Sequence, residues 1–358
     1  MRLDSQEPTN PAKARIRHYA DILNPLFWHD DFYRIDRFFE LVCTMIRASG
    51  MKDTGWESHY ESLAFLNDFK ALGEIDLPQE KFLSPAQTRT RLALISYCHL
   101  IEMNLPYELL ANLLRLRIGQ KYAIDPFAHL RTPITAKEGG VKRIVKMRPV
   151  SPEKKIKEIE EMSAKAGMPE VGVALRGTYD PTIRNAVYHS DYVVHDGNMH
   201  LLSDSRFSEK LQINTPEVEF EDLVHLTAEA FGFHSALEIL YQRACTLLKD
   251  YKGKFLPYDQ NYKGVLELTF DEDTLTGFRA YWPNGTLSVY HRSSDGQCDA
   301  VNLDYNSDGS INFFVGEIFS NRSSFSPCVE VGSEPVYAEV PGSTKRPYWP
   351  DVIRAYEL

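Results

Sequence analysis

Cysteine is scarce in this chain, and the few cysteines that occur stand far apart. They are odd in number and no two lie at CxxC spacing: Cys43, Cys98, Cys245, Cys298 and Cys328. Neither a disulfide framework nor a cysteine-bound zinc ion is therefore indicated. The chain also contains no P-loop, no GxGxxG and no GxSxG, so kinase, dinucleotide and α/β-hydrolase chemistry are set aside. We expect no metal ion and no other cofactor.

Long apolar runs are lacking as well. No stretch approaches the roughly 18 uncharged apolar residues that a membrane span needs. The N-terminus begins Met1-Arg2-Leu3-Asp4 and leads into no apolar run, so we expect no signal peptide. These absences predict a soluble, cytoplasmic protein without a membrane partner.

Positive charge is in short supply overall, but not evenly so. The net charge of −10 argues at first sight against a polyanionic partner. Residues 253–358 carry 8 Lys/Arg and 15 Asp/Glu, a net of −7, whereas residues 1–252 carry 32 and 35, a net of −3. The first part is nearly neutral, which leaves room there for a local basic patch that binds phosphate.

Apolar residues, in contrast, are plentiful and regularly spaced. The 358 residues are 43% apolar and 25% charged, the balance of a folded protein with material for two or three domains. Up to about residue 251 the apolar residues recur at helical spacing. Ser84 followed by Pro85 predicts a helix start, with the serine as N-cap and the proline in the first turn.

Beyond residue 252 the apolar period changes to two. Alternating runs are separated by Asn-Gly and Asp-Gly dipeptides, which predicts an antiparallel meander. We therefore expect a multidomain α+β protein with three parts. These are an N-terminal helical region at 1–80, a helical domain with an inserted β-hairpin at 81–252, and a β-rich C-terminal domain at 253–358.

One basic segment interrupts the helical part. Residues 132–152 contain Gly139-Gly140 and several prolines and few aromatics, which predicts an exposed loop. Its basic residues are candidates for binding an RNA backbone: Lys142, Arg143, Lys146 and Arg148. The alternative is a charged loop that is merely solvated.

The segment 179–192 carries the strongest candidate for chemistry. Arg184 and His189 stand at R-x4-H spacing, with Asn185 directly after the arginine. With 22 arginines and 11 histidines in the chain, chance alone supplies roughly 0.7 such pairs, so the spacing needs structural context. Asp180 and Pro181 supply it, because they predict a helix that starts just before the pair and ends near His189.

These three residue types suit the cleavage of a phosphodiester. His189 and Asn185 are four apart and share a helix face, and a long arginine can reach across from about 140° round the helix. A histidine near a helix C-terminus can carry the proton of acid–base catalysis. An arginine fork can hold a phosphate and stabilise the charge that grows on it.

A β-hairpin is predicted directly after this helix. Residues 192–202 alternate around Asp196-Gly197, the dipeptide that favours a type I′ turn. One face would be apolar, with Tyr192, Val194, Met199 and Leu201, and the other would carry Val193, His195, Asn198 and His200. Together with His189 and Asp191 these histidines could be drawn as a metal cluster. No recognised ligand spacing supports that reading, and solvated hairpin residues are the better account.

The string Ile183-Arg184-Asn185-Ala186-Val187-Tyr188-His189-Ser190 resembles the R-N-x-x-x-H signature of HEPN (higher eukaryotes and prokaryotes nucleotide-binding) domains, in particular abortive-infection-like ribonuclease members. The resemblance is specific over about 15 residues and does not reach residues 1–80 or the β-rich tail. It implies a helical bundle and a metal-independent endoribonuclease, of the kind found in phage-defence and toxin effectors, with RNA as partner. It also implies that Arg184, Asn185 and His189 are the catalytic residues.

Two other interpretations of the segment remain open. Arg184 could form an ion pair with a neighbouring helix while His189 caps its own helix, a purely structural role. The domain could also be a catalytically silent HEPN-like adaptor that binds a protein or a nucleotide.

A count of acid–base groups predicts the assembly. Cleavage by the 2′-hydroxyl needs both a base and an acid, yet each chain offers one R-x4-H histidine on this helix. A twofold axis beside the helix would supply two, which is also the assembly that the resemblance implies. We therefore expect a homodimer, which a protein trigger or inhibitor could regulate.

Overall fold

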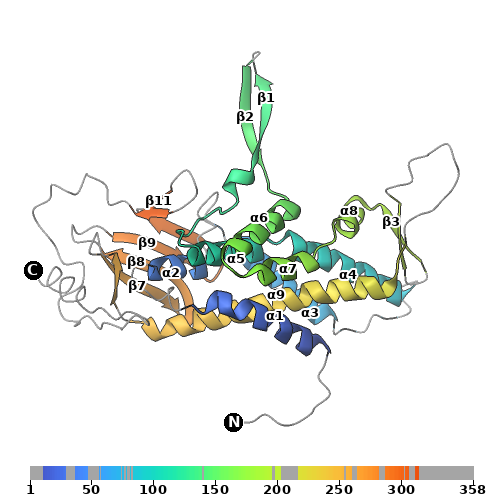
Figure 1. The fold of residues 1–358 in the computed structure, drawn as a ribbon, viewed down its shortest axis with the longest axis horizontal. Coiled ribbons are helices and arrows are strands. Elements are labelled where there is room, and N and C mark those ends of the chain that lie inside the picture. Colours follow the sequence, from blue (N-terminus) through green and yellow to red (C-terminus); the bar gives the residue numbers. More distant parts are fainter. Residues whose placement is uncertain are drawn as a thin grey trace, which may run out of the picture. The chain divides into compact units, whose positions relative to one another are not determined.

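The computed structural model describes a mixed helical and antiparallel β protein (Figure 1). The described residues are 11–29, 37–46, 56, 58–73, 75, 78, 81, 84–138, 141–195, 198–202, 217–253, 255–259, 264–281, 287–301, 303–305 and 311–313. Within them the helices are α1 Pro11–Phe27, α2 Phe38–Ile46, α3 Ser58–Gly73, α4 Pro85–Glu102, α5 Asn104–Arg117, α6 Pro152–Lys165, α7 Pro169–Gly177, α8 Pro181–His189 and α9 Phe220–Leu248, with short 3-10 turns at Ala128–Leu130 and Lys249–Tyr251.

The strands form four separate antiparallel sheets within the described residues. Two are a ribbon of β1 Thr132–Glu138 with β2 Val141–Arg148 and a three-stranded sheet of β3 Tyr192–His195, β4 Asn198–Leu201 and β5 Glu217–Val218. The other two are a five-stranded meander of β6 Phe255–Asp259, β7 Gly264–Asp271, β8 Thr274–Tyr281, β9 Leu287–Arg292 and β10 Cys298–Val301, and a pair of β11 Leu303–Tyr305 with β12 Ile311–Phe313.

The chain divides into two compact units, each assembled from separate stretches of sequence. The first contains Met1–Leu23, Ser62–Pro106 and Ser151–Glu238. Its core gathers buried residues of α4, α8, β4 and the first part of α9: Leu94, Tyr97, Cys98, Leu100, Ile101, Ile183, Ala186, Met199, Leu201, Leu223 and Ala230. Helix α8 and the hairpin that follows it are therefore held by the same core.

The second unit contains Asn24–Glu61, Tyr107–Val150 and Ile239–Leu358, and its meander packs against α2. Phe39 of α2 meets Phe278 of β8 edge to face, with ring centroids 5.1 Å apart. Gly277 lies beside Phe278 where β8 pairs with β9, and a Cβ atom there would stand 2.1 Å from the carbonyl oxygen of Tyr290. Only glycine permits the two backbones to approach so closely.

Several local predictions are confirmed. The Ser84 hydroxyl caps α4 by accepting from the backbone N–H of Gln87 at 3.3 Å. Strands β3 and β4 pair in the predicted register, Tyr192 opposite Leu201 and Val194 opposite Met199. The described part of the C-terminal region does contain an antiparallel meander, β6 to β10, whose strands are adjacent in chain order.

The prediction of a loop over 132–152 is wrong. The structure has β1 and β2 there, followed by the start of α6 at Pro152. The described side chains of both strands, those of residues 132–137 and 143–148, are all exposed. A strand with no buried face shows no alternation of apolar and polar residues, so its sequence pattern carries no strand signal.

Among the described residues, no helix is both long enough and apolar enough to cross a membrane.

Candidate functional site

Helix α8 begins where the sequence predicts, and a side-chain cap defines its start. The Asp180 carboxylate accepts hydrogen bonds from the backbone N–H groups of Thr182 and Ile183, at 2.8 and 3.0 Å. Pro181 occupies the first helical position, where no N–H is needed. The backbone N–H of Asp180 donates to the Tyr97 hydroxyl of α4 at 2.9 Å. The start of α8 is thereby anchored to α4 by a specific hydrogen bond.

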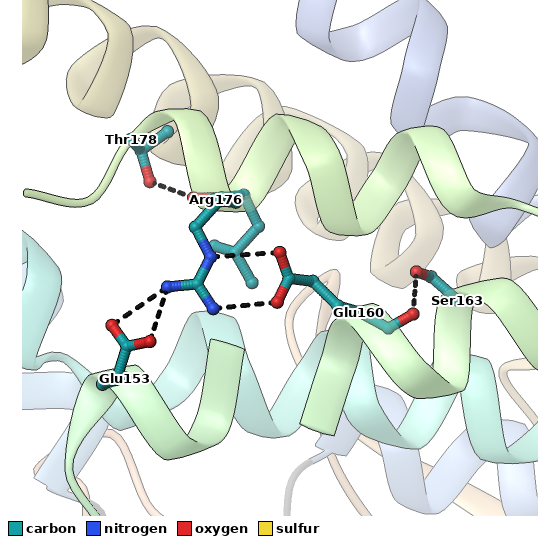
Figure 2. Close-up of polar contacts among 6 residues, drawn as sticks. Glu153, Glu160, Ser163, Arg176 and Thr178 are labelled. Atoms are coloured by element: carbon teal, nitrogen blue, oxygen red, sulfur yellow. Dashed lines mark hydrogen bonds and ion pairs between the residues drawn. The ribbon is translucent and has the colours of Figure 1, made fainter. Parts of the chain in front are cut away.

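The segment before α8 is fixed by an ion-pair network between α6 and α7 (Figure 2). The Arg176 guanidinium donates to both oxygens of Glu160, at 3.0 and 2.8 Å, and to both oxygens of Glu153, at 2.9 Å. Hydrogen bonding from Arg176 lowers the pKa of the Glu160 carboxyl. Two residues further on, the buried Thr178 hydroxyl donates to the Leu175 carbonyl oxygen at 2.7 Å and closes the end of α7.

The end of α8 is equally well defined. Ser190 adopts the left-handed conformation, with φ of 57°, and its N–H donates to the Val187 carbonyl oxygen at 3.2 Å. The N–H of Asp191 donates to the Ala186 carbonyl oxygen at 2.8 Å. This pair of bonds satisfies carbonyl groups that would otherwise be unpaired at a helix C-terminus.

The packing of α8 decides which of its side chains meet solvent. Ile183 and Ala186 face the core and are 4% and 2% exposed. The candidate residues Asn185 and His189 are exposed, and Arg184 is half-buried. All three therefore lie outside the apolar core, on a helix that is fixed at both ends.

The Arg184 guanidinium is held in place by three neighbours. Its Nε lies 2.7 Å from Oε1 of Glu102, at the end of α4, and its Nη2 donates to the same oxygen. Its Nη1 donates to Oδ1 of Asn185 at 2.8 Å. The guanidinium carbon lies 4.7 Å from the centroid of the Tyr188 ring. An arginine with these contacts keeps one orientation, and it still keeps 25% of its side chain exposed.

The motif consists of Arg184, Asn185 and His189, and in the structure Asn185 contacts Arg184 directly. His189 stands on the last turn of the same helix. The ion pair with a neighbouring helix, one part of the structural interpretation, is present. Sequence reasoning missed its partner Glu102, because 82 residues separate it from Arg184 and no local pattern links them.

The other sequence candidates stand apart from α8 along the chain. Arg143, Lys146 and Arg148 are exposed on β2. The backbone of Lys142 belongs to the same strand, and its side chain lies outside the described part of the structure.

The two histidines of the hairpin lie near each other, and His200 also lies near Glu217. Nε2 of His200 lies 3.9 Å from Oε1 of Glu217, and the rings of His195 and His200 stand 6.3 Å apart. In the described part of the chain no three His, Cys, Asp or Glu side chains are grouped so that they could hold a metal ion. Nor does Cys98 look like a nucleophile, since burial raises the pKa of its thiol to about 12.

A cavity of about 800 Å³ lies elsewhere in the first unit. Its lining comes from the N-terminal turns of α4 and α9 and is mostly apolar, including Ala93, Leu94, Leu223 and Val224. Helix α8 contributes no lining residue, so the cavity and the R-x4-H motif are separate features.

Comparison of the chain with protein-family models, curated proteins and solved structures finds no match.

Proposed function

We propose that this chain is a metal-independent endoribonuclease of HEPN type and that α8 carries its catalytic residues. The observation that supports this most is the arrangement of Arg184. Its guanidinium is oriented by Glu102 and Asn185, is partly open to solvent, and belongs to the same short, doubly fixed helix as the exposed His189. An oriented positive charge and a histidine for proton transfer are the groups that phosphodiester cleavage requires.

In the proposed reaction, His189 transfers protons and Arg184 binds the scissile phosphate. The 2′-oxygen of the RNA attacks phosphorus and loses its proton to a base, while the bond from phosphorus to the 5′-oxygen breaks. An acid returns a proton to that 5′-oxygen, which leaves a 2′,3′-cyclic phosphate and a free 5′-hydroxyl. Asn185 orients the guanidinium and the reacting groups.

Glu102 has a definite place in this proposal as a positioning residue. In the free protein its carboxylate is the partner of Arg184, with 33% of its side chain exposed. A phosphate that approaches the guanidinium competes with this carboxylate for the same N–H groups. Glu102 therefore orients the arginine at some expense of phosphate affinity.

The working assembly that we propose is a homodimer with α8 near the twofold axis. One chain supplies one R-x4-H histidine, and the reaction needs both an acid and a base. An isologous interface would bring two copies of His189 and Arg184 to one phosphate. Light scattering should give about twice the mass of the chain, and a strictly monomeric protein that cleaves RNA would refute this assembly.

The alternative function is a catalytically silent adaptor that binds a protein or nucleotide. The observation that favours it is the same ion pair, since Glu102 already neutralises the arginine that would bind phosphate. We further propose that the enzyme is a phage-defence or toxin effector. This part of the proposal rests on the sequence resemblance alone.

Incubation of the pure protein with mixed RNA in excess EDTA separates the two functions. An enzyme of the proposed kind should cleave, and Arg184→Ala or His189→Ala should remove most of the activity. Both variants alter exposed or half-buried side chains, so circular dichroism should report unchanged folding. The adaptor would leave the RNA intact, and equal cleavage by all three proteins would remove α8 from the mechanism.

A further inference from the structure

The ribbon of β1 and β2 exposes both of its faces. Ile144 and Val145 are 65% and 62% exposed, and Ile134 and Met147 are also exposed. A two-stranded ribbon that buries neither face is only marginally stable in water.

A β-bulge arranges the basic residues of this ribbon. Ile134 pairs with Lys146 and Thr135 pairs with Ile144, so Val145 is an extra residue in β2. Beyond the bulge Ala136 pairs with Arg143, and before it Thr132 pairs with Arg148. Directly paired residues share a face, and Thr132, Ile134 and Ala136 alternate onto one face of β1.

The bulge therefore puts Arg143 on the same face as Lys146 and Arg148. Regular alternation would have put Arg143 on the opposite face, because it is an odd number of residues from Lys146. We name this surface the basic face. It spans about 13 Å along the ribbon, because its cations pair with Thr132 to Ala136 of β1, four residues apart at roughly 3.3 Å per residue.

Charge identifies the class of partner. Residues 132–148 carry five Lys/Arg and one Glu, a net of +4, in a chain whose net charge is −10. A second copy of the ribbon would be repelled by like charge, whereas a polyanion would be attracted. A nucleic acid duplex presents a phosphate charge every few ångströms, so three cations spread over this face can each reach one.

The ribbon lacks what a single-strand binder uses. Proteins that bind single strands stack bases on aromatic side chains, and residues 132–148 contain no Phe, Tyr or Trp. An RNA duplex, in contrast, is recognised mainly through its phosphates and 2′-hydroxyls across a wide, shallow minor groove, and these contacts need no aromatic side chain. The composition of the ribbon therefore favours a double helix.

We propose that the β1–β2 ribbon binds double-helical RNA, with Arg143, Lys146 and Arg148 on its phosphates. The choice of RNA rather than DNA rests on the proposed function. The contacts to phosphate and the preference for a duplex rest on the ribbon itself.

Fluorescence anisotropy with a labelled 20-base-pair RNA duplex tests this proposal. The full chain would be used in its His189→Ala form, so that the probe stays intact, and compared with the same protein carrying Arg143→Gln, Lys146→Gln and Arg148→Gln. We expect the triple variant to bind more than about tenfold more weakly at low salt. The slope of log K against log salt should become shallower by about one for each cation removed.

Two controls separate the basic face from charge alone. Lys137→Gln removes an exposed cation from the opposite face and should change affinity little. The exchange Arg143→Ile with Ile144→Arg keeps composition and net charge but moves the guanidinium to the other face. It should weaken binding about as much as Arg143→Gln does.

Three results would overturn the proposal: no binding of the RNA duplex, equal losses for Lys137→Gln and Arg143→Gln, or binding of single-stranded RNA or duplex DNA as tight as that of duplex RNA. Because binding is measured without cleavage, these results are distinct from failure of the catalytic proposal. That failure would appear as intact RNA in the EDTA assay while the duplex still binds.

Discussion

Arg184 of α8 and Glu102 of α4 form an ion pair in which Nε of the arginine lies 2.7 Å from Oε1 of the glutamate. The pair links the two helices that share the core beneath the proposed site. The structural and the catalytic interpretations of α8 predict different effects when this contact is removed.

Substitution of Glu102 tells the two interpretations apart. If phosphate competes with Glu102, then Glu102→Gln should lower the KM for RNA by about fivefold, because a partly exposed ion pair is worth about 1 kcal/mol. Glu170→Gln, which removes an exposed carboxylate of α7, is the matched control. Initial rates over a range of RNA concentrations measure the effect, and an unchanged KM in both variants would contradict the competition.

The left-handed residue after α8 provides a test of its C-terminus. Ser190 has a φ of 57°, which costs a side-chain-bearing residue about 1 kcal/mol or more relative to glycine. Ser190→Gly should therefore raise the free energy of unfolding by up to about 1 kcal/mol, whereas Ser190→Val should lower it. Urea denaturation measures both. A stabilised valine variant would show that the αL geometry is not maintained.

Two glycines of α7 differ in the space around them. A Cβ at Gly172 would stand 2.6 Å from Oγ of Ser163 and 2.8 Å from Cα of Glu160, whereas a Cβ at Gly177 would meet nothing within 4 Å. Gly172→Ala should destabilise the protein by about 1–3 kcal/mol through overpacking against α6. Gly177→Ala, the control, should be neutral or stabilising by up to about 1 kcal/mol. Similar effects of the two in thermal denaturation would argue against the close packing of α6 and α7.

The ion pairs of Arg176 should make the stability of the protein depend on pH in the acid range. Hydrogen bonding lowers the pKa of Glu160 in the folded protein, so its contribution to stability is present above the unfolded pKa and is lost as pH falls through the folded pKa. Wild type should therefore lose more stability than Glu160→Gln as pH falls from about 5 to about 3. Partial exposure keeps the difference small. If urea titrations showed the same pH dependence of the free energy of unfolding for both proteins, the network would not lower the pKa of Glu160.

The local features of the candidate site could be predicted from sequence, and its tertiary contacts could not. Asp180 and Pro181 act within a few residues, and the Asp196-Gly197 dipeptide is a short sequence signal, so α8 and the pairing of β3 with β4 can be recognised from short patterns. The approach of Glu102 to Arg184 depends on how α4 and α8 pack, and no local pattern encodes it. The β1–β2 ribbon was not predicted for a different reason: its described side chains are all exposed, and the Gly139-Gly140 dipeptide is typical of a loop sequence.

The most direct test of the central claim is the chemical identity of the RNA ends. A short RNA should be incubated with wild type and with Arg184→Ala in EDTA, and the products analysed by mass spectrometry. The account predicts 2′,3′-cyclic phosphate and 5′-hydroxyl ends from wild type, and a loss of most product from the variant. Products with 3′-hydroxyl and 5′-phosphate ends, or equal cleavage by both proteins, would contradict it.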